Sequence, residues 1–300
     1  MYEDEDGSTY QYEYIRICKE PQEGFSIHPA FAHNGTEQDY IYVGAYLGSI
    51  NNATLWSLSG KQPFTLYRSA HEITKKAQYY RDCAANKGTG WSEYDISAHA
   101  AIQMLYLIEY ATNDSQTAVG KGCCQVSTLS STGGCDGIYN LTGGDENTDY
   151  TKQVVYRGIE DLWGNGLTFV DGVQSRLGYS LYVSTQQSNY SSNTNVGGYA
   201  ALSYTTTNVP RPVMKMGLDP NNPAYMFSIE ANTEAGESIG YCDAQQIGSS
   251  SNYAYSVVTC GGFTNGYLNG IFYYVSSSSS SDDVALTNVT SRLLYVPSSS

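Results

Sequence analysis

The sequence predicts an α+β domain with an antiparallel sheet, preceded by a small N-terminal β region. Two apolar stripes with helical spacing come early, and many short β-branched or aromatic segments follow them between long polar loops. No internal repeat is found. A chain of 300 residues can bury a sizeable core. We expect an N-terminal β or attachment region at 1–38 and a ligand-binding domain at 39–300.

The first elements are predicted from alternation and turn residues. Polar and apolar side chains alternate over 9–18, which predicts a strand, and 25–31 is typical of a short extended piece. His33-Asn34-Gly35-Thr36 is a tight-turn signal, and 40–46 predicts the next strand.

Two helices are expected next. Residues 69–72 match a capping box, and an apolar stripe continues from there to a stop at Gly88. The second helix is predicted over 92–111, with Ile96, Ala100, Met104, Leu107, Ile108 and Ala111 on one side. His71 and His99 lie in these helices, and we interpret them as structural or solvent-facing, because neither has a His or carboxylate at ligand spacing.

The middle of the chain alternates between loops and strands. Residues 118–149 are rich in Gly, Ser and Thr and predict a long ordered loop. Strands are predicted at 179–185 and 197–207, and the run Val209-Pro210-Arg211-Pro212 is expected to break the second of them.

The C-terminal stretch 242–295 combines a strand frame with a binding-type surface. Strands are predicted at 256–259, 270–275 and 291–296, and the remaining positions are mostly Tyr, Ser, Asn, Asp and Gly. Tyr supplies stiff amphipathic contact area and Ser, Asn and Gly supply adaptable hydrogen bonding, as in antibody paratopes. The alternative is a flexible linker at 276–281 between ordinary strands. We expect Ile271, Val275, Leu286, Val289, Leu293 and Val296 to point inward and the Tyr and Ser positions outward.

Charge and cysteine content exclude several function classes. A net charge of −14 without clustered Lys and Arg argues against nucleic acid and anionic membranes as partners. The N-terminus does not resemble a signal peptide, and no apolar run has membrane-spanning length. Seven cysteines cannot all pair within one chain, so we expect reduced, buried thiols made in a cytoplasm. Cys123-Cys124 with Cys135 fits no zinc spacing, and neither a metal site nor a cofactor is predicted.

Several strings together resemble a known family. Residues 156–173, YRGIEDLWGNGLTFVDGV, resemble the conserved core segment of the C-type-lectin-like fold shared by formylglycine-generating-enzyme-like domains and the variable proteins of diversity-generating retroelements. GFSIHPAF at 24–31, YVGAY at 42–46 and NKGTGW at 86–91 look like phage tail proteins of that group. The segment 260–295 is similar to their variable region. Within the core segment we expect Trp163 and Phe169 to be buried, Gly158, Gly164 and Gly166 to permit close approach, and Asp161 and Asp171 to bond nearby amides.

The resemblance implies a C-type-lectin-like fold and a receptor-binding phage tail-tip protein that is not an enzyme. Its implied location is the virion tail, after synthesis in the host cytoplasm, with the bacterial cell surface as the alternative. The implied partners are a bacterial cell-surface protein or glycan and other tail proteins. A homo-oligomer is expected, with the trimer as the usual state of such tips. The ligand-binding candidates within the variable region are Tyr253, Tyr255, Phe263, Asn265, Tyr267, Asn269, Tyr273, Tyr274, Ser276, Ser278, Ser280 and Asp282.

Two other functions remain open on the same fold. For a formylglycine-generating-type oxidase, the resemblance would imply a copper site made by two closely spaced cysteines late in the domain. Here Cys260 stands alone after Cys242. A calcium-dependent lectin would need its Glu-Pro-Asn or Gln-Pro-Asp and Trp-Asn-Asp motifs, which the sequence lacks. The acidic run at 143–149 and the pair Asp282-Asp283 are interpreted as solvated surface, with weak binding of a hard cation as the alternative.

Overall fold

The computed structural model describes ten stretches of the chain, namely 2–3, 9–10, 16–65, 76–141, 149–191, 197–206, 211–231, 241–249, 255–276 and 287–297. Its helices are α1 (Lys76–Ala85), α2 (Ile96–Tyr110) and α3 (Ser115–Ala118), with 3-10 turns η1 (Pro29–Phe31), η2 (His33–Gly35), η5 (Leu177–Tyr179), η6 (Gln187–Asn189) and η7 (Gly266–Leu268). The strands are β1 (Tyr2–Glu3), β2 (Thr9–Tyr10), β3 (Tyr42–Val43), β4 (Ser49–Asn51), β5 (Thr54–Trp56), β6 (Trp91–Glu93), β7 (Val155–Tyr156), β8 (Ile159–Glu160), β9 (Leu167–Arg176), β10 (Ser180–Val183), β11 (Ala200–Thr205), β12 (Arg211–Met216), β13 (Ser228–Ala231), β14 (Tyr241–Ile247), β15 (Tyr255–Thr259), β16 (Tyr274–Ser276), β17 (Val289–Thr290) and β18 (Leu293–Tyr295).

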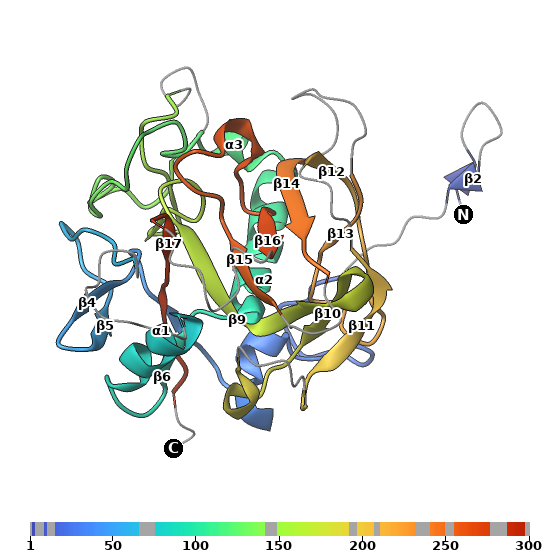
Figure 1. Ribbon diagram of the computed structural model, residues 1–300. Helices are drawn as coiled ribbons and strands as arrows, with labels where there is room; N and C mark the ends of the chain where they lie inside the picture. Colours follow the sequence, from blue (N-terminus) through green and yellow to red (C-terminus); the bar gives the residue numbers. More distant parts are fainter. Residues whose placement is uncertain are drawn as a thin grey trace.

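The architecture is α+β, as predicted. A nine-stranded sheet has the order β11-β10-β9-β15-β16-β14-β12-β13, with β17 added beside β9. Its strand pairs are antiparallel except for two parallel pairs, β14 with β16 and β17 with β9. The sheet is therefore mixed, whereas an antiparallel sheet was predicted. Figure 1 shows the long strand β9 crossing the centre of the fold, with α2 packed behind it.

The second predicted helix, expected over 92–111, is confirmed as α2. It begins at Ile96 because the Asp95 carboxylate accepts a hydrogen bond from the Ala98 amide, and it ends where Ala111 adopts a left-handed conformation. The predicted apolar side is correct for Ile96, Ala100 and Met104, which are buried in the main core, and wrong for Ile108, which is 60% exposed. The first predicted helix corresponds to α1, and the capping box at 69–72 lies outside the described residues.

Several predicted strands are shorter than expected. Of 40–46 only Tyr42–Val43 is a strand, and 25–31 ends in the turn η1. Of the strand predicted at 9–18, Thr9–Tyr10 is a strand that pairs with Tyr2–Glu3 and 16–18 is not, whereas 11–15 lie outside the described residues. The strand predicted at 197–207 is observed as β11 and ends at Thr205, before the run 209–212, as expected, and a separate strand, β12, begins at Arg211 with Pro212 paired to Ala244. The tight turn at 33–36 is confirmed, with Asn34 at φ 55°.

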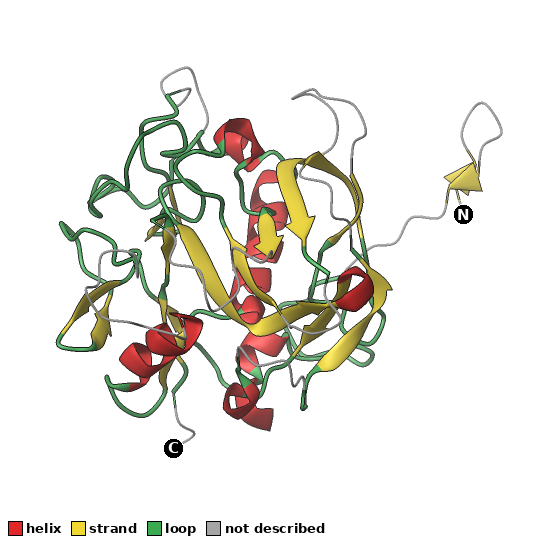
Figure 2. Cartoon of the chain, in the orientation of Figure 1, coloured by secondary structure: helices red, strands yellow, loops and turns green. Residues whose placement is uncertain are grey.

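The long loop after α3 is confirmed for the part that the structure describes. Residues 119–141 contain neither helix nor strand (Figure 2) but pack against the core segment 156–173. Trp163 is fully buried and donates from Nε1 to the Gly120 carbonyl at 2.8 Å. A Cβ at Gly164 would lie 2.7 Å from the Cys123 nitrogen, so the predicted close approach is real there. Asp161 accepts from the side-chain amides of Gln153 and Asn165, as expected.

Arg292 joins three separate segments inside the molecule. Its guanidinium is fully buried and donates to the carbonyl oxygens of Gly44, Glu160 and Asp161 at 2.8, 2.6 and 3.0 Å. A buried cation with several well-placed acceptors restricts the chain to one arrangement. The last strand, β18, is therefore fixed to the core segment as well as to its neighbours β3 and β6.

Candidate binding surface

Eight of the twelve predicted binding residues are described, and they divide into two groups. Tyr255, Asn265 and Tyr267 are partly exposed, as the prediction requires. Five others are buried, and the expectation that they face outward is wrong: Phe263, Asn269, Tyr273, Tyr274 and Ser276. Tyr253, Ser278, Ser280 and Asp282 lie outside the described residues, as does Leu286 of the predicted frame.

The burial of Tyr273 and Tyr274 follows from a strand that starts late. The predicted strand 270–275 begins only at Tyr274, and the residues before it form a turn over α2. Tyr274 packs against Phe227 with ring centroids 4.6 Å apart and against His99 at 5.6 Å. Tyr273 belongs to a second apolar cluster that includes Phe169. Both rings therefore help to stabilise the fold.

The polar members of the buried group are occupied by internal hydrogen bonds. Asn269 donates to the Gly262 carbonyl at 3.0 Å. Ser276 lies 2.5 Å from the Ser175 hydroxyl and accepts from the Gly248 amide at 3.1 Å. These side chains are consequently not available to a ligand.

The expected frame does point inward. Ile271, Val289, Leu293 and Val296 are buried, and Val275 is partly buried. The inward positions of the prediction are thus confirmed wherever the side chain is described, with Val275 as the least covered.

One end of the central strands collects polar and aromatic side chains. Tyr255 begins β15, and Ile247 of β14 lies opposite Ser276 of β16. The 3-10 turn η5 joins this end, because Ser249 Oγ accepts from the Gly178 amide at 2.8 Å. We call Leu177, Tyr179, Ser249 and Tyr255 the strand-end patch.

Sequence analysis missed the η5 part of this patch. Leu177 is 62% exposed and Tyr179 is exposed to 36%. The alternating pattern assigned Tyr179 to a strand, whereas the residue has φ 60° in the turn. No local signal in the sequence indicates that this turn meets the loop after β14.

A second group lies beyond the other end of β15. Asn265 accepts from the Gly262 amide at 2.8 Å, and Tyr267 lies in η7. A Cβ at Gly262 would be 3.2 Å from Asn265 Oδ1 and 3.3 Å from Asn288 Nδ2, so Asn288 is close to Asn265. We call Asn265, Tyr267 and Asn288 the turn patch. A five-residue strand spans about 16 Å, so the two patches are separate.

The titratable groups of the core form structural contacts. His33 Nε2 lies 2.5 Å from Asp95 Oδ2, which also accepts from the Tyr190 hydroxyl at 3.0 Å. His99 is fully buried with Nε2 3.0 Å from the Ile271 carbonyl, and burial lowers its pKa to about 4. The structural interpretation of His99 is confirmed. Across the described stretches, no three His, Cys, Asp or Glu side chains gather as metal ligands would.

Six cysteines have described side chains, and all six are free thiols: Cys18 is partly exposed, and Cys83, Cys123, Cys124, Cys135 and Cys260 are buried. Burial raises the pKa of Cys124 to about 11 and those of Cys135 and Cys260 to about 12. The thiol form therefore dominates near neutral pH, and the thiolate needed for alkylation is scarce.

We expect iodoacetamide at about pH 8 to label Cys18 rapidly and Cys83, Cys123, Cys124, Cys135 and Cys260 slowly in the native protein. Peptide mass spectrometry over time measures this, and denatured protein, in which all seven cysteines react, is the control. Fast native labelling of Cys260 would contradict the description of a closed, unreactive thiol.

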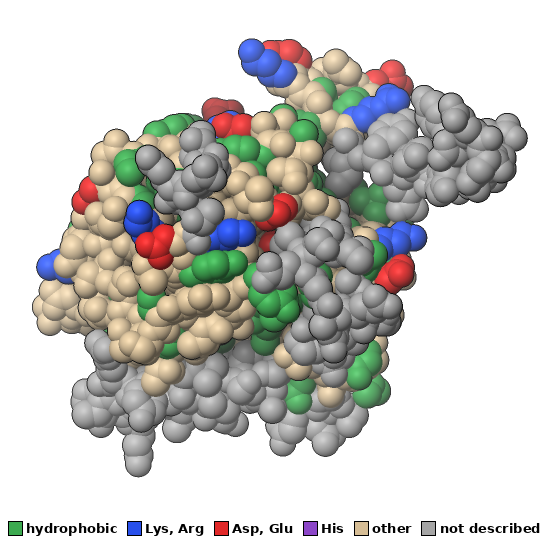
Figure 3. Space-filling model, turned by 90° about the horizontal axis from the view of Figure 1, so that it is seen from above, with side chains coloured by type: hydrophobic (Ala, Val, Ile, Leu, Met, Phe, Trp, Pro, Cys, Tyr) green, Lys and Arg blue, Asp and Glu red, His purple; other side chains and the backbone are tan. Residues whose placement is uncertain are grey.

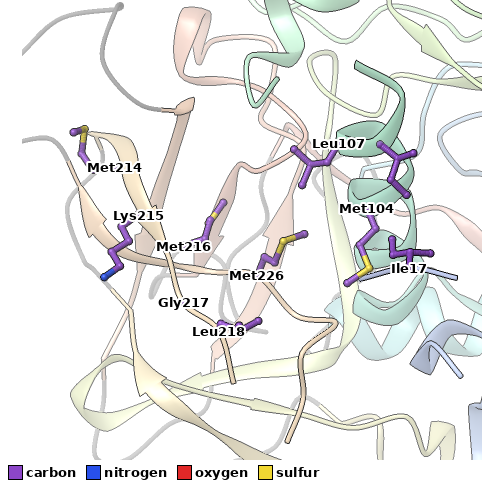
Figure 4. A pocket seen from close by; sticks show the side chains of 10 residues that line it. Ile17, Met104, Leu107, Met214, Lys215, Met216, Gly217, Leu218 and Met226 are labelled. Atoms are coloured by element: carbon purple, nitrogen blue, oxygen red, sulfur yellow. The ribbon is translucent and has the colours of Figure 1, made fainter. Parts of the chain in front are cut away.

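An open groove of about 480 Å³ lies between α2 and β12 (Figure 4). Its apolar lining comes from α2, from β12 and from three residues outside them: Met104, Leu107 and Ile108, Met214 and Met216, and Ile17, Leu218 and Met226. Methionine side chains adapt to irregular gaps. The groove contains none of the predicted binding residues.

None of the described helices is long and apolar enough to cross a bilayer. The face in Figure 3 carries mostly uncharged polar side chains and backbone, with charged side chains scattered among them. No protein-family model matches the chain, and no curated protein matches it.

Proposed function

We propose that the chain is a receptor-binding protein with a C-type-lectin-like fold, of the kind diversified by retroelements and carried on phage tail tips. It acts by binding a bacterial surface protein or glycan, not by catalysis. The α+β architecture and the sequence resemblance of 156–173 support the fold. The antiparallel pairing of β3 with β18, which closes the ends of 39–297 on each other, supports one domain over that range.

One observation carries the proposal: in the C-terminal stretch 242–295, residues that directly flank two Tyr-, Ser-, Asn- and Asp-rich segments, 250–254 and 277–286, belong to the exposed patches or lie beside them. Residues 250–254 lie outside the described residues, and the residues on either side of them, Ser249 and Tyr255, both belong to the strand-end patch. Residues 277–286 begin after Ser276 at that patch and finish just before Asn288 of the turn patch. The proposed binding surface therefore comprises both patches, with Tyr255 in one and Tyr267 in the other.

The five buried candidates change which residues should carry binding energy. Phe263, Tyr273 and Tyr274 belong to the packing beneath this surface. Tyr255 and Tyr267 remain as aromatic anchors, because interface energy concentrates on a few aromatic side chains.

We expect Tyr255→Ala and Tyr267→Ala each to weaken binding to bacterial cells by about 1–3 kcal/mol, with the melting temperature nearly unchanged. Fluorescently labelled protein, titrated onto intact cells of strains that bind wild type, measures the first effect. Tyr139→Ala is the matched control, since Tyr139 is 64% exposed and lies outside both patches. The proposal fails if no strain in a broad bacterial panel binds, or if both variants bind like wild type.

Diversification has its own test in the surrounding DNA. We expect a near-identical repeat of the segment encoding 242–295 and a reverse-transcriptase gene beside it. If both are absent, the proposal of diversification is wrong. The proposed binding function is then still tested by the cell assay.

A further inference from the structure

A row of aromatic side chains crosses the small sheet β3-β18-β6, away from both patches. The strand register places Tyr295 of β18 opposite Tyr42 on one side and Trp91 on the other. The ring centroids of Tyr42 and Tyr295 are 6.0 Å apart, and those of Tyr295 and Trp91 are 4.9 Å apart. Tyr40 extends the row beyond Tyr42 at 5.4 Å.

Lys87 joins this row to a further indole. Its Nζ lies 3.6 Å from the Trp56 ring centroid and 4.6 Å from that of Trp91. Contact of a cation with two indole faces is favourable and holds the ammonium in place. We call Tyr40, Tyr42, Tyr295, Trp91, Trp56 and Lys87 the aromatic ledge.

The motif NKGTGW at 86–91 is explained by this ledge. It supplies both Lys87 and Trp91 from the turn between α1 and β6. Gly90 has φ +84°, and a Cβ there would lie 2.8 Å from the Tyr295 ring. Only glycine allows the ring to occupy this position without displacement.

The ledge is open to solvent. Tyr40, Tyr42 and Trp56 are 54%, 57% and 39% exposed, and the other members are partly exposed. Side chains of this size present roughly 400 Å² together, about half of the ~800 Å² that each partner contributes to a stable protein interface. A ligand smaller than a folded protein therefore fits the ledge better.

The charged residues at the two ends of the ledge favour an acidic ligand and determine which end of the ledge its anionic group occupies. Lys87 is the one charged member of the ledge in a chain with net charge −14. Asp39 precedes Tyr40 at the opposite end of the row, so an anion is favoured at the Lys87 end. The chain as a whole repels long polyanions, whereas a single carboxylate at Lys87 is attracted over a short range.

We propose that the aromatic ledge is a saccharide site for a short glycan bearing an acidic sugar. The C–H faces of sugar rings pack on Tyr42, Tyr295 and Trp91 while their hydroxyl groups stay in water. The sugar carboxylate pairs with the Lys87 ammonium. This site is separate from the proposed receptor surface and does not depend on it.

The test uses an array of defined acidic (uronic- and sialic-acid) and neutral oligosaccharides, followed by calorimetry with the strongest binder. We expect acidic oligosaccharides to bind and Tyr42→Ala or Trp56→Ala to weaken that binding about tenfold or more. Lys87→Gln should weaken binding of the acid but not of its methyl ester, and Lys87→Arg should restore it. Melting temperatures verify that each variant is folded.

Several outcomes would overturn the proposal. They are no binding to any acidic oligosaccharide, binding that Tyr42→Ala leaves intact, or equal loss of acid and ester in Lys87→Gln. If the wild-type protein binds no glycan, and Tyr42→Ala abolishes its binding to a purified protein partner, the ledge is a protein interface instead. Tyr255→Ala should bind the oligosaccharide like wild type, so failure at the ledge and failure of the receptor surface are distinguishable.

Discussion

Trp163→Ala is expected to lower the free energy of unfolding by about 3–5 kcal/mol, the usual cost of deleting a fully buried aromatic side chain. Trp163 is 0% exposed within the main core. Its loss leaves a large cavity and removes the hydrogen bond to the Gly120 carbonyl. Because that bond fixes the chain just before Cys123 and Cys124, the long loop should loosen as well.

Thermal and urea unfolding of the full chain measure this effect. A loss of this size corresponds to a fall of roughly 10 °C in melting temperature for a large domain. Trp163→Phe is the matched control, since it keeps a large ring but removes the N–H donor, and it should cost less. If Trp163→Ala melts at the same temperature as the wild type, the core segment does not stabilise the fold in the way described.

Some parts of the fold are specified by the local sequence and could therefore be predicted. Helix α2 is specified locally by the Asp95 cap and by apolar residues at helical spacing, and its bounds are predicted within four residues, although Ile108 of that pattern is exposed. The inward frame at Ile271, Val289 and Leu293 is also specified locally, because aliphatic side chains gain stability only when buried.

A high tyrosine content does not tell which tyrosines are buried and which are exposed. Of the 29 tyrosines, Tyr80, Tyr94, Tyr106, Tyr156, Tyr225 and Tyr274 are among the largest fully buried side chains. A tyrosine ring suits a core as well as a surface when its hydroxyl is satisfied, as for Tyr80, whose hydroxyl lies 3.0 and 3.1 Å from the Phe64 and Val289 carbonyl oxygens. Composition alone therefore could not separate Tyr274 from Tyr267.

Contacts between distant residues were also beyond prediction. The 2.5 Å contact of His33 with Asp95 joins positions 62 residues apart, and the ledge combines Tyr42, Trp91 and Tyr295 through strand register. Neither arrangement leaves a short-range pattern, since both depend on how the strands pair.

Asp161→Asn is expected to make the protein more stable above neutral pH than wild type. The Asp161 side chain is fully buried, and Oδ2 accepts from Gln153 and Asn165 at 2.6 and 2.7 Å. Oδ1 has no hydrogen-bond partner among the described residues. Burial, reinforced by the neighbouring Glu160 charge, raises the pKa of Asp161 to about 7. The folded protein therefore keeps a proton that the unfolded chain releases near its usual pKa of 3.8.

The direction follows from proton linkage. At low pH both states are protonated, and the stability associated with the neutral carboxyl is fully present. As pH rises through the interval between the two pKa values, the unfolded state alone loses the proton, so stability falls by about 1.4 kcal/mol per pH unit. Above about pH 7 the folded state also ionises and the loss stops growing. Asparagine does not titrate, keeps the acceptor oxygen, and suits the positive φ of 54° at this position.

Urea unfolding of wild type and Asp161→Asn between about pH 5 and pH 8 measures the effect, and the variant should gain roughly 3 kcal/mol relative to wild type across that range. Asp136→Asn is the control with opposite sign. Hydrogen bonds from Ser59 and Tyr46 lower the pKa of the exposed Asp136, so its removal costs stability at neutral pH and not in acid. If the stability difference between wild type and Asp161→Asn does not change with pH, Asp161 is already ionised in the folded protein and its burial is compensated by the buried Arg292 guanidinium.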